Sequence, residues 1–308
     1  MNIYYVKDEQ DIDKMAQDER CFIICNQEHF KVIKEQFNLF RAEEHRHGDQ
    51  FDLIHFKRYV DHDVLSFSFF EWLNQGFQFE KVQLYISKQY VIFICNQNKA
   101  LCESVMETIQ TDQDTQPNGM PTLIFIYYKI LDHILSNMFL SLEIFEKHMA
   151  NIENGLLTKG TIHLFDDIVK VKNLSFEVKR HLRLLTYIGD DMVSDDNNLI
   201  AEANIKYFKN ISTKMNRLYE FGTSLHTKSE HLMDTYNATV SGETNDFINK
   251  LTIVTVFATP ITILSGIYGM NFVNMPELRF KYGYFILLAL VIISGIGIFR
   301  YLKKSNML

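Results

Sequence analysis

The stretch Leu251-Thr-Ile-Val-Thr-Val-Phe-Ala-Thr-Pro-Ile-Thr-Ile-Leu-Ser-Gly-Ile-Tyr268, followed by Gly269-Met270-Asn271-Phe272, decides the fold of this chain. Residues 251–268 carry no charged side chain, and at about 1.5 Å of rise per residue a helix of this length crosses a bilayer core of about 30 Å. A second uncharged apolar run extends from Tyr282 to Phe299. The two runs predict a transmembrane hairpin within residues 251–308, with spans at about 251–268 and 282–301.

One face of the first span carries small polar side chains. Steps of alternately four and three residues follow one face of a helix, and from Asp234 they lead through four threonines to a glycine. The other faces carry Ile, Val, Leu and Phe. Small polar residues within a span either mediate helix packing or line water. Because a single helix cannot enclose a pore, a water-lining role requires an oligomer. The residues on these steps are Asp234, Ala238, Ser241, Asn245, Ile248, Thr252, Thr255, Thr259, Thr262 and Gly266.

Residues 1–115 are predicted to form a cytoplasmic α/β domain, because short β-rich runs alternate with helical patterns. The runs at 82–86 and 91–95 are separated by four residues and predict a β-hairpin. We find no phosphate loop, dinucleotide fingerprint or nucleophile elbow, so we do not expect an enzyme. The predicted strands are 3–6, 21–25, 51–56, 64–70, 82–86 and 91–95, and the predicted helices are 28–39 and 99–111.

Residues 116–250 are predicted to form a helical stalk after a polar, proline-containing linker at 111–121. Glycines at 155–160 and 189–195 suggest breaks between three helices. We expect these helices at 121–154, at 161–188 and from about 196 into the first span. The third would have roughly 70 residues and be about 105 Å long.

A seven-residue repeat runs along the third predicted helix and is typical of a coiled coil. It is apolar at first and weakens toward the membrane. The repeat fits helices that diverge around a central lumen, and it also fits simple packing on the two preceding helices. Its two positions are occupied by Phe208, Met215, Gly222, Ser229 and Tyr236, and by Ile211, Leu218, Leu225, Leu232 and Thr239.

Composition excludes several other classes of site. The formal net charge of −7 does not indicate nucleic acid as a partner. The four cysteines are Cys21, Cys25, Cys95 and Cys102, and we interpret them as small buried thiols in a reducing compartment rather than a metal site. The segment 43–49, Glu-Glu-His-Arg-His-Gly-Asp, lacks helical i,i+4 ligand spacing and is interpreted as a solvated loop.

Basic residues near the spans set the expected orientation. Lys250 precedes the first span, whereas Arg300, Lys303 and Lys304 follow the second. The N-terminal residues show no basic start and apolar middle of a cleavable signal. We therefore expect a multi-pass protein in the lipid of the cytoplasmic (inner) cell membrane, with both termini in the cytoplasm.

Several of these features together resemble the CorA family of divalent-cation channels. The hallmark is the triplet Gly269-Met270-Asn271 at the end of the first span. The resemblance continues through Met275-Pro276-Glu277-Leu278, the two-span hairpin and the basic tail. It is close over residues 200–308 and architectural before them.

The resemblance implies an α+β membrane protein assembled as a homopentameric funnel, in which the first span of each subunit lines a central pore. The implied ion is Mg²⁺, with cobalt or nickel sometimes carried too. Mg²⁺ would act as both transported and regulatory ion, and no other cofactor is expected. Gly269, Met270 and Asn271 would form the selectivity filter, with Asn271 contacting the hydrated metal ion. The implied pore-lining residues are Gly266, Thr262, Thr259, Thr255, Thr252, Ile248, Asn245 and Asp234.

The chain departs from the family pattern at several positions. Ile248 and Thr259 stand where the family often has methionine. We expect Ile248, with Leu251 behind it, to form a hydrophobic gate that closes by dewetting. An acidic position that the family uses for Mg²⁺ sensing is Asn210 here, so the regulatory site is not located. Other acids that could serve are Asp190, Asp191, Asp195 and Asp196.

Two other functions stay open. One is a zinc transporter of the same family, because a related branch varies the residues near the triplet. The other is a membrane-anchored coiled-coil scaffold or sensor, whose hairpin is only a tether. The threonine face separates the channel from the scaffold, since a tether does not need four threonines on one face. The sequence does not rank magnesium, cobalt, nickel and zinc.

Overall fold

The computed structural model describes residues 2–6, 9–12, 20–36, 55–59, 62–96, 98–111, 117, 120, 122–159, 164–194, 200–270 and 280–304. Asn271, Asp195, Asp196 and the segment 43–49 therefore lie outside the described residues. The chain divides into two compact units, Met1–Met233 and Asp234–Leu308. Each unit is described by itself.

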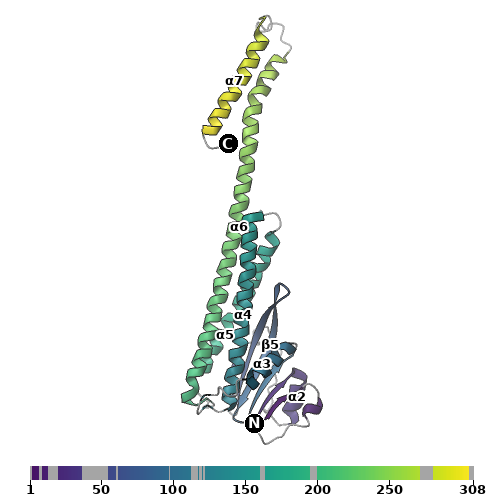
Figure 1. Ribbon diagram of the computed structural model, residues 1–308, viewed down its shortest axis with the longest axis vertical. Helices are drawn as coiled ribbons and strands as arrows, with labels where there is room; N and C mark the ends of the chain where they lie inside the picture. The colour runs from purple at the N-terminus through teal and green to yellow at the C-terminus, as the bar shows by residue number, and fades with distance from the viewer. Residues whose placement is uncertain are drawn as a thin grey trace. The chain divides into compact units, whose positions relative to one another are not determined.

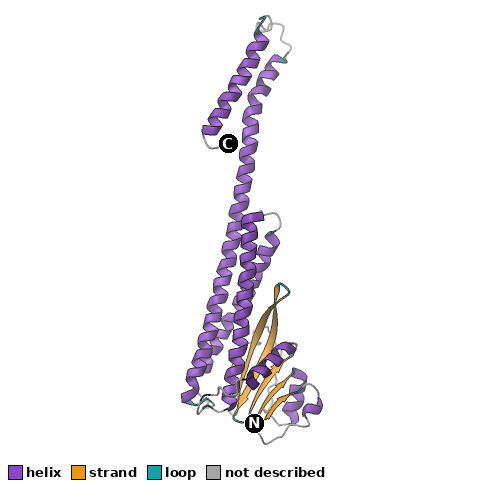
Figure 2. Ribbon diagram, in the orientation of Figure 1, coloured by secondary structure: helices purple, strands orange, loops and turns teal. Residues whose placement is uncertain are grey.

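The described part of the first unit contains a six-stranded mixed sheet with the order β1-β2-β6-β5-β4-β3 (Figure 2). The parallel strands are β1 (Asn2–Tyr5), β2 (Cys21–Cys25) and β6 (Tyr90–Cys95). The antiparallel part continues through β5 (Gly76–Ser87), β4 (His62–Leu73) and β3 (His55–Arg58). All five residues of β2 are buried, as expected for an apolar run in the middle of a sheet.

The predicted hairpin is confirmed, because β5 and β6 pair antiparallel. The sequence reasoning did not find the longer hairpin of β4 and β5, which turns at Asn74 and Gln75 with positive φ angles of 50° and 60°. Asn tolerates this left-handed conformation better than most residues, but the turn lacks the Asn-Gly signal that marks such hairpins. The predicted strand 51–56 overlaps β3 at residues 55 and 56, and its residues 51–54 lie outside the described ranges.

Helices cover both faces of the sheet (Figure 1). Helix α2 (Gln27–Gln36) places Phe30 and Ile33 in one core with Ile23 and Ile92, to which the short helix α1 (Glu9–Ile12) also contributes. Helix α3 (Lys99–Thr111) instead contacts α4 (Thr122–Lys159), which packs on β2, β4, β5 and β6 from the other face. The neighbouring parallel strands β2 and β6 are thus followed by helices on opposite faces.

The long helices differ from the sequence prediction at their ends. The break predicted at 155–160 is wrong as far as Lys159, because α4 continues as a helix through Gly155 to that residue. The break predicted at 189–195 is wrong as far as Val193, because α5 (Phe165–Val193) continues through Gly189. The third long helix, α6 (Ile205–Tyr268), follows a short 3-10 helix, η3 (Glu202–Asn204), instead of starting near residue 196. Its 64 residues correspond to about 96 Å.

The seven-residue repeat of α6 is buried by the preceding helices in the first unit. Both positions of the repeat are buried from Phe208 to Leu232. Phe208 stacks on Tyr127 of α4 with ring centroids 5.8 Å apart, and the Ser229 and Ser175 hydroxyl oxygens are 2.9 Å apart across α5 and α6. The interpretation that the repeat packs on the two preceding helices is confirmed for these residues. Tyr236 and Thr239 belong to the second unit and are half-buried.

Three described helical stretches are long and apolar enough to cross a membrane: Thr122–Leu156, Glu202–Tyr268 and Gly283–Arg300. The sequence reasoning predicted two spans. In the first stretch, 56% of the most apolar window is buried inside the protein, whereas none of the window is buried in the other two. The apolar side chains of α4 therefore form core with the sheet, whereas the most apolar windows of the other two stretches are left for lipid or neighbouring subunits.

Gly189 and Gly155 provide a matched test of helix packing. A Cβ at Gly189 would lie 3.1 Å from Cα of Ser212 on α6, whereas a Cβ at Gly155 would lie 3.6 Å from the nearest atom of Leu164. Both Gly→Ala changes gain about 1 kcal/mol of helix propensity, but overpacking costs about 1–3 kcal/mol. We expect Gly189→Ala to melt several degrees below Gly155→Ala in thermal unfolding of the full-length protein. Equal melting temperatures would contradict this close helix contact.

Candidate functional site

The predicted hairpin consists of the C-terminal part of α6 and helix α7 (Gly283–Lys304), which lie side by side in the second unit (Figure 1). Each helix has a half-buried stripe between exposed residues. On α6 the stripe recurs at spacings of four, three, four and four, so it forms one face turned toward its partner helix. The half-buried residues are Ile253, Phe257, Pro260, Leu264 and Tyr268 on α6, and Gly283, Leu287, Val291, Ser294, Gly295 and Ile298 on α7.

The four threonines of the first span form a column on the other side of α6, which we call the threonine column. Thr252, Thr255, Thr259 and Thr262 are all exposed, as is Gly266. At 3.6 residues per turn, the centre of this column is roughly 160° around the helix axis from the half-buried stripe. The hairpin contact therefore leaves the threonines uncovered, and they are not explained by packing within the subunit.

Each threonine hydroxyl donates a hydrogen bond to the carbonyl oxygen four residues earlier. The Oγ1–O distances are 2.8 Å for Thr252 to Ile248 and 2.9 Å for Thr255 to Leu251, and 2.7 Å for Thr259 to Thr255 and 2.9 Å for Thr262 to Ala258. The hydroxyl proton is thereby occupied, and the remaining lone pairs on Oγ1 can only accept. The column thus presents acceptors along about 15 Å of helix. A hydrated cation exposes the hydrogens of its water shell, which are donors, so the column is complementary to it.

The predicted gate residues follow the column toward the N-terminal end of the helix. Ile248 lies on the line of the column, and Leu251 lies about 60° to one side. Their side chains are 51% and 57% exposed, so neither is covered within the subunit. Further back, Asn245 and Asp234 are also exposed. These large apolar side chains are therefore left for lipid or for other copies of the chain.

The column ends where α6 ends, at Gly269 and Met270. The Gly269 N–H donates to the Ser265 carbonyl at 3.0 Å, and the Met270 N–H donates to the Ile267 carbonyl at 3.2 Å. A Cβ at Gly269 would lie 3.1 Å from that Ser265 oxygen, so glycine suits the turn that leads out of the helix. Met270 is exposed. Sequence reasoning assigned Gly269 only to the filter; its helix-ending role is signalled by glycine directly after the last helical residue.

The described residues do not identify a regulatory metal site. Asn210, Asp190 and Asp191 are exposed, and the Asp191 carbonyl accepts a hydrogen bond from Arg58. Within the described ranges, no group of three or more His, Cys, Asp or Glu residues is placed to hold a metal ion.

The four cysteines are free and buried, which confirms the prediction that they are buried thiols. Burial raises the pKa of Cys21 to about 11 and raises that of Cys25 further. Both thiols are therefore neutral at physiological pH, and neither is poised to act as a nucleophile.

Comparisons with known proteins agree with this arrangement. A family model described as "CorA-like Mg2+ transporter protein" matches residues 22–304. The cobalt/magnesium transport protein CorA of Thermotoga maritima is 24% identical over 253 residues, covering 82% of this chain and 71% of the relative. The magnesium transport protein CorA of Bacillus subtilis is 24% identical over 244 residues, covering 76% and 73%.

Among solved structures, the complete CorA magnesium transporter from Methanocaldococcus jannaschii matches with a TM-score of 0.81 at 16% identity, covering 96% of this chain and 94% of that chain. At this identity the match establishes the fold. It confirms the predicted succession of an N-terminal α/β domain, long helices and a C-terminal helical pair.

Proposed function

The chain belongs to the family of CorA-like Mg²⁺ transporters, and from this premise we propose that it is a channel through which hydrated Mg²⁺ crosses the cytoplasmic membrane. The observation that carries the mechanism is the exposed threonine column on the face of α6 turned away from α7. The column offers hydrogen-bond acceptors to the water shell of the ion. Because Mg²⁺ dehydrates reluctantly, a pathway that contacts its waters spares the cost of removing them.

The pathway requires several copies of the chain, and we propose a homopentamer. Residues 241–250 of α6 are exposed on all sides of the helix, including Phe247, whose side chain is 68% exposed. An isolated helical segment without packing is marginally stable in water. Neighbouring copies would cover this segment and bring five threonine columns around one axis. The second helix, α7, would then lie outside the first and face lipid.

Selection and gating are assigned to the two ends of the column. At one end, five Asn271 amide oxygens next to Gly269 and Met270 would accept hydrogen bonds from the ion's waters. At the other end, five Ile248 side chains, with Leu251 beside them, would form an apolar constriction that empties of water when closed. Asn245 and Asp234 would line the cytoplasmic entrance, where the Asp234 carboxylate attracts cations.

The membrane potential is sufficient to drive uptake. With both termini in the cytoplasm, as the basic residues flanking the spans favour, ions would move inward. At about 2.3 kcal/mol per charge per 100 mV, a divalent ion gains roughly 4.6 kcal/mol on entering a cell that is 100 mV negative inside. Internal Mg²⁺, bound between soluble parts of neighbouring subunits, would close the channel, and no other cofactor is required.

The proposed function is tested by ion uptake into proteoliposomes under an inside-negative potential. We expect Mg²⁺ uptake, with Co²⁺ and Zn²⁺ measured in parallel. Zn²⁺ flux without Mg²⁺ flux would instead make the protein a zinc transporter. No flux of any of these ions from a well-folded oligomer would favour a membrane-anchored scaffold or sensor.

The threonine column has its own test in the double variant Thr255→Val, Thr259→Val. Valine keeps the shape of threonine but removes the acceptor oxygen, and a typical hydrogen bond contributes about 0.5–1.5 kcal/mol. We expect Mg²⁺ uptake to fall by roughly tenfold while the oligomer persists in size-exclusion chromatography. The matched control is Thr239→Val, whose hydroxyl also bonds back to its own helix but lies before the proposed gate. Unchanged uptake in the double variant would remove the hydroxyls from the pathway.

A further inference from the structure

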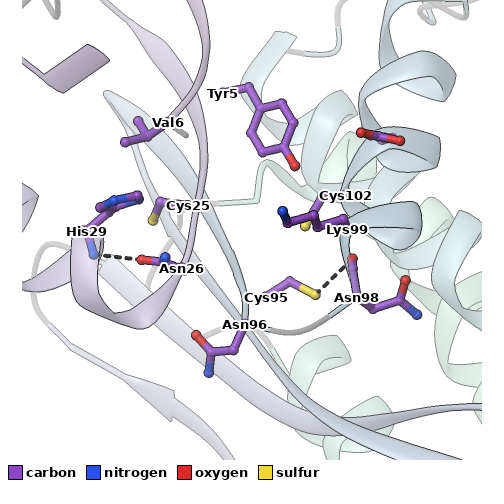
Figure 3. Close-up of a pocket in the computed structure, with 11 residues that line it drawn as sticks. Tyr5, Val6, Cys25, Asn26, His29, Cys95, Asn96, Asn98, Lys99 and Cys102 are labelled. Carbon is purple, nitrogen blue, oxygen red and sulfur yellow. Dashed lines mark hydrogen bonds between the residues drawn. The ribbon is translucent and has the colours of Figure 1, made fainter. Parts of the chain in front are cut away.

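A cavity of about 330 Å³ lies in the first unit at the carboxyl ends of the three parallel strands (Figure 3). The strand ends contribute Val6, Cys25 and Cys95, and the first turns of α2 and α3 contribute His29 and Lys99. The volume falls in the range of small-molecule sites, about 300–1,000 Å³. None of these residues belongs to the proposed ion pathway, which lies in the second unit.

The cavity lies where the topology of the sheet opens a crevice. Strand β2 leads to α2 on one face, whereas its parallel neighbour β6 leads to α3 on the opposite face. In open sheets flanked by helices, ligands bind outside the carboxyl ends of the strands at such a switch point. The location is therefore one that α/β folds use for binding.

The asparagines at the two strand ends leave donors free at this crevice. The side-chain oxygen of Asn26 accepts from the His29 N–H at 2.7 Å, and that of Asn96 accepts from the Gln27 N–H at 2.7 Å. Both oxygens thus cap the start of α2. Among the described residues, the amide Nδ2 groups of Asn26 and Asn96 have no hydrogen-bond partner in the structure, so each can donate to a bound molecule.

The groups of the cavity that could hold an anion lie on the side where α2 and α3 start. Lys99 is exposed in the first turn of α3, and the N-terminal ends of α2 and α3 carry partial positive charge. The Nδ1 atom of His29 is buried without a partner in the described part of the chain. Burial raises the pKa of the Cys25 thiol. The pKa of the Cys95 thiol is raised mainly by a hydrogen bond with Cys102 and also by burial. The thiol lining is therefore neutral. Negative charge comes from Glu103 in the lining and from Glu80, whose carboxylate accepts hydrogen bonds from the Cys95 thiol and from the Asn96 and Asn98 N–H groups.

We propose that this cavity binds a small organic anion of about mononucleotide size, with its phosphate or carboxylate group held by Lys99 and the side-chain amides of Asn26 and Asn96. Val6 and the neutral thiols would contact the apolar body of the molecule. The site is independent of the proposed ion pathway, so either can fail without the other.

The test is calorimetric titration of the full-length protein in detergent, in buffer without divalent cations, with AMP and citrate as probes. Two variants remove the proposed contacts: Lys99→Met removes the ammonium, and Asn26→Asp keeps the oxygen that caps α2 while placing a negative charge in the cavity. The matched control is Lys88→Met, an exposed lysine in the turn between β5 and β6, at the opposite end of β6. Melting temperatures verify that all three variants are folded.

We expect saturable binding of AMP or citrate that weakens at least about tenfold in Lys99→Met and in Asn26→Asp, and is unchanged in Lys88→Met. The probe that binds identifies the anionic group as phosphate or carboxylate. The proposal is overturned if neither probe binds at millimolar concentration, or if binding is insensitive to both cavity variants. If inorganic phosphate bound as tightly as AMP, the cavity would not recognise the organic part of the molecule, and the proposal of an organic anion would be overturned.

Discussion

Replacing Asn271 with alanine is expected to abolish Mg²⁺ uptake into proteoliposomes while leaving the oligomer intact. Mg²⁺ holds its waters in near-octahedral geometry, and those waters are polarised donors that need acceptors. The proposed ring of Asn271 amide oxygens would supply these acceptors, and alanine would supply none. Hydrogen bonds to charged groups are worth about 1.5–3 kcal/mol each, so the loss of several of them predicts a fall in uptake of more than about 100-fold.

The matched control for this change is Asn274→Ala, which removes the same amide three residues further along the chain. We expect this variant to transport Mg²⁺ at close to the wild-type rate. Size-exclusion chromatography reports whether both variants assemble. Normal Mg²⁺ flux through Asn271→Ala would remove Asn271 from the selectivity role and move selection to another part of the column.

Replacing Ile248 with glycine is expected to open the closed channel. An apolar constriction excludes ions because water leaves it, and removal of five isoleucine side chains would widen it and allow it to stay wet. We expect uptake to continue at high internal Mg²⁺, with closed-state flux raised by at least about tenfold. The measurement compares Mg²⁺ flux into proteoliposomes loaded with high and with low internal Mg²⁺.

Glycine also weakens a helix by about 1 kcal/mol relative to alanine, so this variant needs a control on the same helix. Val254→Gly serves because Val254 is 63% exposed and lies about 120° around α6 from Ile248. It carries the same backbone change away from the proposed constriction. A closed-state flux that is unchanged in Ile248→Gly, or equally raised in Val254→Gly, would place the gate elsewhere.

Local pattern was sufficient for several elements of this protein. Strand β2 and helix α3 have the predicted bounds, because an apolar run between polar segments and an amphipathic helix are both set by neighbouring residues. The absence of charge over 251–268 and the spacing of the four threonines likewise come from sequence alone. The candidate pore face therefore follows from the order of residues along one helix, and the role of Asn271 rests on the sequence motif.

Other features depend on contacts between residues far apart in the chain. Glycine both ends helices and allows close helix approach, and only the Ser212 backbone beside Gly189 shows that the second role applies there. Hydropathy alone does not distinguish the buried apolar side of α4 from a membrane span. The pairing of β4 with β5 depends on a turn whose residues have no strong signal.

The sequence by itself thus determined the two spans, the threonine column and the family signature, because each is a pattern among near neighbours. Tertiary structure decided which side of α6 the partner helix covers, and so left the column free for a pathway. It also decided that β2 and β6 send their helices to opposite faces, which creates the cavity at their ends. Both outcomes depend on which surfaces meet in space, and the order of residues along one helix or strand does not specify that.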